Sequence, residues 1–230
     1  MITVFTAGHV VRRAWIGMAA LAVAASVGGL AACSDDPSVP TVAQARAQGA
    51  GTKATVEGYV TVAPGAFESA MGNPGFALQD NSGGIYVKLT TRLAFALGAH
   101  VRVTGTLADE AKFRILSAES ASVQLLSGTR TVAPEVVTTG AVGEATEGKL
   151  VRVTGRVTKT FEDDSPYGYK LYVNDGTGEV QIFVHLFPGV PTSTLRALTT
   201  AQTIQVTGLS AQYESSYEVA PRQAADIVVK

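Results

Sequence analysis

Cysteine is almost absent from this sequence, and this scarcity limits how the folded protein can be stabilised. Among its 230 residues only Cys33 carries a thiol. A disulfide within the chain is therefore excluded, and packing of apolar side chains must supply the stability. Aromatic residues make up only 7% of the chain, so a segment where they gather is informative.

Histidine and the local motifs of catalytic sites are also scarce. The three histidines, His9, His100 and His185, form no H-x-x-H or H-E-x-x-H spacing. The sequence has no G-x-S-x-G turn, Walker loop or dinucleotide fingerprint. The acidic run EDD at residues 162–164 lacks the alternating register of a calcium loop, so a solvated loop is the better interpretation. We therefore expect no catalytic residue, no metal site and no cofactor, and predict that the protein is not an enzyme.

An excess of basic residues is missing as well. The formal net charge is −1, from 18 Lys and Arg against 19 Asp and Glu. Residues 1–32 contain two arginines and no acid, so the chain from residue 33 onward has a net charge of −3. A protein that binds nucleic acid by neutralising phosphates is normally basic. The charge therefore argues against strong nucleic-acid binding.

The first 33 residues differ from the rest. Arg12 and Arg13 precede an apolar run of 16 residues at 14–29, which suits a signal peptide and is short for a stable bilayer span. The sequence LAAC follows at residues 30–33. This segment resembles the lipobox of bacterial lipoproteins, with Leu at −3, small residues at −2 and −1, and cysteine at +1. An uncleaved anchor helix with an incidental cysteine is the alternative.

The lipobox resemblance implies a signal peptide over residues 1–32 and lipidation of Cys33. The mature protein would then be extracytoplasmic and attached to a membrane of the cell envelope, because several acyl chains on one residue hold firmly. Ser34 is not the aspartate that retains such proteins in the inner membrane of enteric bacteria, which slightly favours the outer membrane. Residues 33–40 are expected to be a polar tether.

Beyond the tether, one β pattern occurs twice. Apolar residues alternate with polar ones and are interrupted by Gly, Asn, Asp and Pro, which indicates an all-β fold. The two copies are offset by 95 to 104 residues and each predicts five strands. The matching segments are VEGYVT (56–61) and VTGRVT (153–158), FALQD (76–80) and LYVND (171–175), GGIYV (83–87) and GEVQI (178–182), VRVTG (101–105) and IQVTG (204–208), and FRI (113–115) and YEV (217–219). In the second copy we predict strands at 150–159, 169–174, 179–184, 202–209 and 216–228.

Five strands with a short helix or loop between the third and fourth is the order of the OB-fold, a Greek-key barrel. In the second copy, residues 191–200 can form that helix and bury Leu195 and Leu198. The motifs V-x-G-x-V-T, F-x-L-Q-D-x-x-G-G-I-x-V and V-x-V-T-G resemble the OB-fold domains found in tandem in secreted bacterial proteins, often beside nuclease or lamin-tail-type modules. The resemblance covers residues 41–230 and implies OB-fold domains at 41–130 and 135–230. The alternative is a single sandwich of ten strands.

The strand alternation also predicts a ligand face on the second copy. Positions Val151, Val153, Val157, Leu171, Val173, Val180, Ile182 and Val184 are expected to point inward. The outward residues and the aromatic loop residues near them form the candidate ligand-binding set: Arg152, Arg156, Lys170, Tyr172, Gln181, Phe183, Tyr167, Tyr169 and Tyr213. Such a surface can stack a ring and pair an anion, although ordinary outer-face residues would look the same. The first copy is poorer, with Glu57, Tyr59, Gln79, Tyr86 and Lys88 expected outward and Phe67 in a Gly- and Pro-rich loop.

These features favour a non-catalytic, envelope-anchored binding lipoprotein whose ligand is an oligonucleotide, a glycan or a protein. One rival is an extracytoplasmic single-stranded nucleic-acid-binding protein or an accessory of a nuclease. The other is a structural adaptor of an envelope complex. The acids at 162–164 lie beside the predicted face and would repel a phosphate chain, which favours a glycan or a protein.

Overall fold

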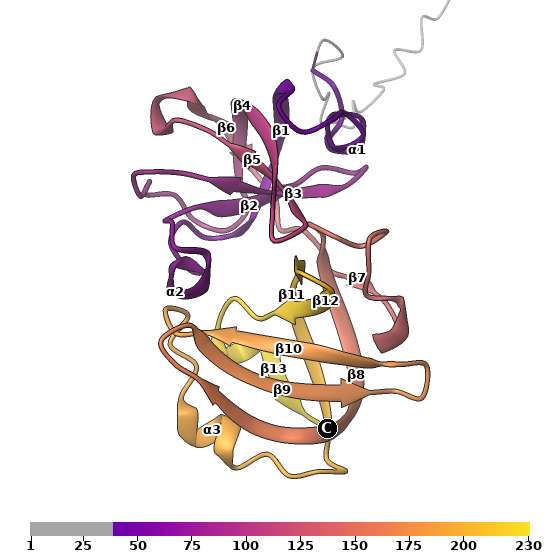
Figure 1. Ribbon diagram of the computed structural model, residues 1–230. Helices are drawn as coiled ribbons and strands as arrows, with labels where there is room; N and C mark the ends of the chain where they lie inside the picture. The colour runs from indigo at the N-terminus through magenta and orange to yellow at the C-terminus, as the bar shows by residue number, and fades with distance from the viewer. Residues whose placement is uncertain (1–38) are drawn as a thin grey trace, which may run out of the picture. The chain divides into compact units, whose positions relative to one another are not determined.

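A computed structural model describes residues 39–230, which fold mainly into two β-sheets (Figure 1). The lipobox and Cys33 lie outside the described residues. Within residues 39–230, the structure contains no helix with the length and apolar character needed to cross a membrane.

The first sheet closes into a barrel of five strands. The strand order is β1-β2-β3-β5-β4, and pairing of β1 with β4 closes the ring. Neighbours are antiparallel except β3 and β5, which are parallel. The barrel strands are β1 (Lys53–Val62), β2 (Phe76–Gln79), β3 (Gly84–Lys88), β4 (Ala99–Glu110) and β5 (Phe113–Ser117). A sixth strand, β6 (Val123–Thr129), extends the sheet beside β4.

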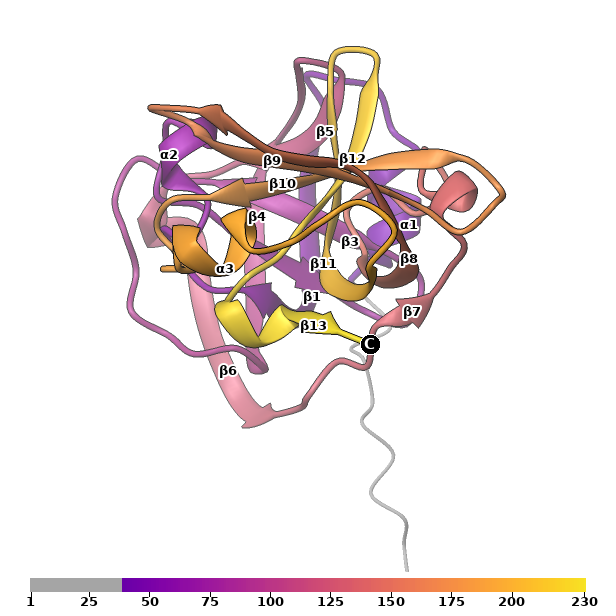
Figure 2. The same ribbon diagram turned by 90° about the horizontal axis from the view of Figure 1, so that it is seen from below.

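The second sheet repeats this topology. Its order is β8-β9-β10-β12-β11, closed by pairing of β11 with β8, and its parallel neighbours within the ring are β10 and β12. The strands are β8 (Leu150–Asp164), β9 (Gly168–Asn174), β10 (Glu179–His185), β11 (Thr203–Tyr213) and β12 (Ser216–Ala220). Two short strands, β7 (Glu135–Val136) and β13 (Ile227–Val229), add to β8 and β11. Figure 2 shows β13 running to the C-terminus.

Two closed five-stranded Greek-key rings of this order are two OB-folds. The predicted fold class is therefore confirmed. The single ten-stranded sandwich is wrong, because each sheet pairs its own first and fourth strands and so closes on itself. The division into domains at 41–130 and 135–230 stays a prediction.

Short helices occupy the connections. The α-helices are α1 (Val42–Arg46), α2 (Glu68–Met71) and α3 (Thr192–Arg196), and the 3-10 helices are η1 (Ser120–Ser122), η2 (Thr139–Ala141) and η3 (Ala224–Asp226). Helix α3 lies between β10 and β11, as predicted, and it buries Leu195 in the barrel core, where Leu198 of the following turn is also buried. The equivalent connection of the first barrel, residues 89–98, is a loop.

The fifth strand of the second copy differs from its prediction. Instead of one strand over 216–228, β12 ends at Ala220 and β13 begins at Ile227. Pro221 follows β12 and has no N–H to donate to a strand ladder. The turn after it is held by Asp226, which accepts hydrogen bonds from the backbone N–H and the guanidinium of Arg222 at 2.9 Å.

A carboxylate in the turn between the second and third strands fixes the lead-in to each barrel. In the first, Asp80 Oδ2 accepts from the Val42 N–H at the start of α1, at 2.8 Å. In the second, Asp175 Oδ2 accepts from the Thr139 N–H in η2, at 3.0 Å. Hydrogen bonds from the hydroxyls of Thr177 and Thr139 lower the pKa of Asp175. Asp80 and Asp175 are 95 residues apart, so this clamp belongs to the repeat.

The predicted inward positions of the second barrel are confirmed, since all eight side chains are at most 3% exposed. Mid-strand glycines keep the strands close together. A Cβ built on Gly155 would lie 3.0 Å from the Asn174 backbone, and one on Gly208 would lie 2.4 Å from the Ala220 carbonyl oxygen. The alternating apolar side chains form the core, and these glycines allow the sheet to close around it.

Two residues of the first barrel that alternation predicts outward, Tyr59 and Tyr86, are buried, at 6% and 0% exposure. Tyr86 is fully buried, because the segment from Phe67 to Gly75 covers the outer side of β3. Its hydroxyl donates to Asn73 Oδ1 at 3.1 Å, and burial raises the pKa of Tyr86. Period-2 alternation shows which side of a strand a residue faces, but not whether another segment covers that side.

Candidate functional site

A row of polar side chains crosses three adjacent strands on the outer face of the second barrel. Tyr172 on β9 is paired in register with Gln181 on β10, and Gln181 is paired with Glu218 on β12. The Tyr172 hydroxyl donates to Gln181 Oε1 at 3.2 Å, and Gln181 Nε2 donates to Glu218 Oε2 at 2.7 Å. The parallel pairing of β10 and β12 therefore brings residues 37 positions apart into one network.

The carboxyl group of Glu218 is the most perturbed group of this row. Glu218 is only 7% exposed, and burial raises the pKa of its carboxyl to about 7, whereas the Gln181 hydrogen bond and the charge of Lys170 act in the opposite direction. Removing a carboxylate from water disfavours its charged form. Lys170 Nζ lies 2.9 Å from Asp164 Oδ2, and this contact raises the pKa of Lys170. The cation nearest to Glu218 on β9 is thus already paired with another acid.

Aromatic side chains line the adjoining surface. Phe183 on β10 is outside the barrel core, as alternation predicts, but is only 6% exposed. Its ring meets His185 edge-on at 4.9 Å between centroids, and His185 stacks on Phe67 at 4.3 Å. Burial lowers the pKa of His185 to about 3, so this imidazole is neutral. Gly168 is required beside Phe183, because a Cβ there would lie 2.5 Å from the Val184 carbonyl oxygen and 2.9 Å from the phenyl ring.

Gln181, Glu218, Lys170, Phe183 and His185 line a depression of about 430 Å³, which we call the Glu218 cleft. This volume falls in the range of small-molecule sites, which are mostly apolar with a few placed polar groups. Helix α2 lies beside the end of β10 in Figure 1 and contributes Phe67 and Met71 to the wall. The charged and polar lining side chains are Asp164, Lys170, Gln181, His185, Gln212, Ser216 and Glu218, and the aromatic ones are Phe67, Phe113, Tyr167, Phe183 and Tyr213.

The cleft contains five of the nine residues of the predicted ligand set. These five are Tyr167, Lys170, Gln181, Phe183 and Tyr213. Tyr167 and Tyr213 are 53% and 66% exposed, so their rings are available to a ligand.

The other four residues of the predicted set do not line the cleft, although Tyr172 is hydrogen-bonded to the lining residue Gln181. Tyr172 carries the Lys159 ammonium over its ring at 4.2 Å, and Arg156 is exposed. Tyr169 packs with Phe161 against the barrel core, at 5.0 Å between ring centroids. Arg152 donates to the Thr207 hydroxyl at 3.0 Å and lines a different depression. The predicted set is therefore divided among separate surfaces.

Sequence reasoning missed Glu218, His185 and Phe113 as parts of this site. Glu218 stands at an outward position of the fifth strand, where a glutamate usually remains in water. The signal for its burial is the parallel contact with β10, and no local pattern in the sequence reports that contact. The sequence places Phe67 in a Gly- and Pro-rich loop of the first copy and gives no sign that it reaches the second barrel.

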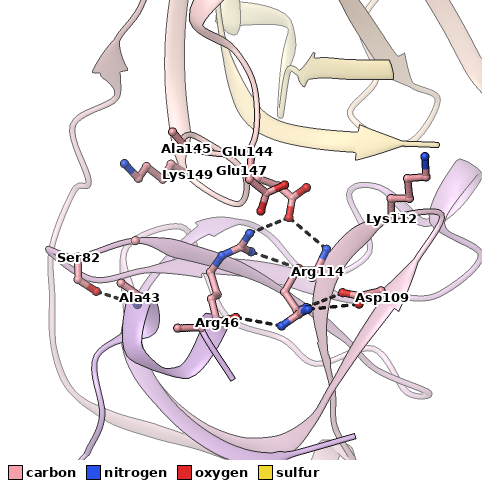
Figure 3. A pocket seen from close by; sticks show the side chains of 12 residues that line it. Ala43, Arg46, Ser82, Asp109, Lys112, Arg114, Glu144, Ala145, Glu147 and Lys149 are labelled. Atoms are coloured by element: carbon pink, nitrogen blue, oxygen red, sulfur yellow. Dashed lines mark hydrogen bonds and ion pairs between the residues drawn. The ribbon is translucent and has the colours of Figure 1, made fainter. Parts of the chain in front are cut away.

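A second depression of about 730 Å³ is lined by charged residues (Figure 3). Glu147 Oε1 accepts from Arg46 Nη2 at 2.7 Å and from the Arg114 N–H at 3.1 Å. Arg114 also contacts Asp109 at 2.5 Å, and its Nη1 donates to two backbone carbonyls. Burial raises the pKa of Glu147. The guanidinium groups of Arg46 and Arg114 are therefore both bound by carboxylates or carbonyl oxygens of the protein itself, and we interpret this cluster as a structural contact.

A third depression, of about 420 Å³, contains Arg152 and Arg222. The guanidinium of Arg222 is held by Asp226 and the Thr61 carbonyl oxygen. Across residues 39–230, no group of three or more His, Cys, Asp or Glu side chains is arranged to hold a metal ion.

No protein-family model matches this sequence. No curated protein matches it either. Among solved structures, an OBody bound to hen egg-white lysozyme matches 43% of this chain and 96% of its own, at 16% identity and a TM-score of 0.34. The Ifi202 HINa domain in complex with 20-bp dsDNA matches 79% of this chain and 96% of its own, at 10% identity and a TM-score of 0.37. A murine DNA-binding protein bound to dsDNA matches 69% of this chain and 86% of its own, at 12% identity and a TM-score of 0.36. The fold assignment rests on the strand order.

Proposed function

We propose that this protein is a non-catalytic binding lipoprotein of the cell envelope, and that its second OB-fold binds a small ligand in the Glu218 cleft. The observation that carries the proposal is the combination found there: a buried carboxyl in a hydrogen-bonded row, next to apolar walls and two exposed tyrosines. Ionisable groups with strongly shifted pKa values in a cleft are typical of functional sites. The scarcity of catalytic motifs in the sequence supports binding without chemistry.

The charges of the cleft argue against a polyanionic ligand. Asp164 and Glu218 both line it, and Lys170, the one lysine or arginine among the lining residues, is paired with Asp164. A phosphate chain would meet an excess of carboxylates, and the net charge of −3 beyond residue 32 would add to the repulsion. The charges of this cleft therefore favour a ligand other than single-stranded nucleic acid.

Envelope anchoring rests on the sequence LAAC at residues 30–33. With Cys33 lipidated and a short tether to residue 40, the two barrels would be held close to the membrane surface. The protein would then bind its ligand in the extracytoplasmic space.

The proposal is tested by amide NMR on the mature chain from residue 33, with Cys33→Ser, titrated with a library of small charged and neutral compounds. Compounds that bind should shift the amides of Gly168, Gln181 and Glu218. Replacing both Tyr167 and Tyr213 by alanine should weaken the binding of these compounds about tenfold, because stacking contacts are lost. Exposed side chains of this kind change stability by only about 0.5 kcal/mol each, so the fold should persist.

Leu125→Ala is the matched control, because Leu125 is 67% exposed and lies on β6, away from the cleft. It should leave the shifts unchanged. A titration with oligo-dT at two salt concentrations should show no salt-dependent binding. Shifts that cluster elsewhere, or a library without any binder at these amides, would contradict the cleft assignment. Tight, salt-dependent oligo-dT binding would favour the nucleic-acid rival.

A further inference from the structure

The buried charge of the Glu218 cleft has no cation of its own. The Glu218 carboxylate receives a hydrogen bond from the neutral amide of Gln181 at 2.7 Å. Lys170 Nζ lies 2.9 Å from Asp164 Oδ2, so this ammonium is neutralised by its own partner. When Glu218 is ionised, the cleft therefore holds one negative charge in excess.

The remaining titratable groups of the lining do not change this balance. They are Tyr167 on the β8–β9 loop, His185 on β10 and Tyr213 at the end of β11. Burial keeps His185 neutral, since its pKa is lowered to about 3. The two tyrosines contribute aromatic rings and hydroxyl groups to the lining. The segments contributed by the first barrel, Phe67 with Ala70 and Met71 at α2 and Phe113 on β5, bring no charge into the lining.

The walls suit a cation with an apolar body. Aromatic rings present a negative face that attracts ammonium groups within about 6 Å of the ring centroid, and the attraction is stronger where water is excluded. Tyr167 and Tyr213 lie at exposed positions of the cleft, and Phe183 and Phe67 at buried ones. An anionic ligand would be repelled by Glu218, and a neutral ligand would leave the buried carboxylate without a counter-charge.

We propose that the Glu218 cleft binds a small organic cation, with its ammonium group at the Glu218 carboxylate and its apolar body against the aromatic walls. This proposal rests on the proposed function and specifies its ligand class. It also accounts for a buried glutamate whose one printed hydrogen-bond donor is a neutral amide and whose neighbouring lysine is paired with Asp164. The cation supplies the charge that the chain does not place there.

Binding of a cation should be coupled to ionisation of the Glu218 carboxyl. The free carboxyl has a pKa of about 7, and the bound cation favours its ionised form. Affinity should therefore be highest above pH 7 and fall as the pH decreases, because the binding-competent ionised state becomes a minor population. Below pH 7, binding should release a proton.

The test is isothermal titration calorimetry on the mature chain carrying Cys33→Ser, at pH 5, 6, 7 and 8. The probes are 2-phenylethylamine, its N,N,N-trimethyl derivative with a permanent charge, neutral 2-phenylethanol and anionic phenylacetate. Both cations should bind, and their affinities should fall at least about tenfold from pH 8 to pH 5. The neutral and anionic compounds should bind at least about tenfold more weakly at pH 8.

Glu218→Gln removes the charge while its amide oxygen can still accept from Gln181. This variant should lose cation binding and its pH dependence. Glu214→Gln is the control, because Glu214 lies in the nearby β11–β12 turn and is exposed, outside the cleft. It should bind both cations as the unmodified protein does. The pH series with the permanent cation needs no variant, so the proposal remains testable if Glu218→Gln fails to fold.

Cation binding that is independent of pH, or retained in Glu218→Gln, would overturn the proposal. Preferential binding of 2-phenylethanol, lost on Tyr167→Ala with Tyr213→Ala, would leave the cleft as the site and reject only the cationic class. If neither these probes nor the wider library shift the amides of the cleft, the proposed function fails as well.

Discussion

Replacing Glu218 by glutamine should change the pH dependence of stability in a calculable way. The pKa of this carboxyl is raised from 4.5 to about 7 by burial in the folded chain. A raised folded pKa means that the contribution of Glu218 to stability is fully present below pH 4.5. It is lost as the pH rises through 7, because the unfolded chain ionises more easily.

The magnitude follows from the shift. Each pKa unit corresponds to about 1.4 kcal/mol, so an upward shift of roughly two and a half units costs about 3 kcal/mol once the carboxyl is ionised. Glutamine has no charge to desolvate. The free energy of unfolding of Glu218→Gln should therefore rise relative to that of the unmodified chain by about 3 kcal/mol between pH 4 and pH 8.

The assay is urea unfolding of both mature chains, each carrying Cys33→Ser, at pH 4, 5, 6, 7 and 8. Comparing the two chains at each pH cancels groups that titrate alike in both, including His185, whose lowered pKa destabilises the fold in acid. A difference in unfolding free energy that stays constant over this range would refute the reasoning, since it would mean that the carboxyl remains solvated in the folded chain.

Two further predictions concern the strand contacts and the anchor. Gly208→Ala should destabilise the protein by about 2 to 3 kcal/mol in chemical denaturation, because its Cβ would lie 2.4 Å from the Ala220 carbonyl oxygen. Gly143→Ala, with no atom within 4 Å of the added carbon, should be neutral or slightly stabilising, and equal costs would contradict the assignment. Cys33→Ser in the full-length precursor should block lipidation and leave the signal segment uncleaved, as read by intact mass and membrane fractionation. A variant cleaved to the same mature sequence and still firmly bound to membranes would remove the lipoprotein hypothesis.

The sequence by itself determined the repeat, the strand class and the barrel core. Valines and isoleucines at every second position required one covered face on each strand, and all eight predicted inward positions of the second barrel are buried. Glycines in the middle of strands and acid-containing turns marked where the chain bends and reverses. These are local signals, because alternation and turn chemistry act over a few residues.

The tertiary structure alone decided which outward residues share a site. Alternation placed Arg152, Tyr172 and Phe183 on outer faces, but the sheet curves into a closed barrel and distributes them over different surfaces. Phe183 is covered at 6% exposure. Removing it should therefore destabilise the fold, and Tyr167 and Tyr213 become the better probes of binding.

Glu218 illustrates the physical limit of the sequence reading. Its neighbour Gln181 is 37 residues away, and the two meet only because β10 and β12 run parallel across a closed ring. Residues of α2 and β5 of the first barrel line the same cleft as Glu218, and burial in this setting raises the pKa of the carboxyl. Periodicity records which face a side chain occupies. The contacts between distant strands decide whether that face is exposed to water, and so whether a glutamate there is a solvated charge or part of a binding site.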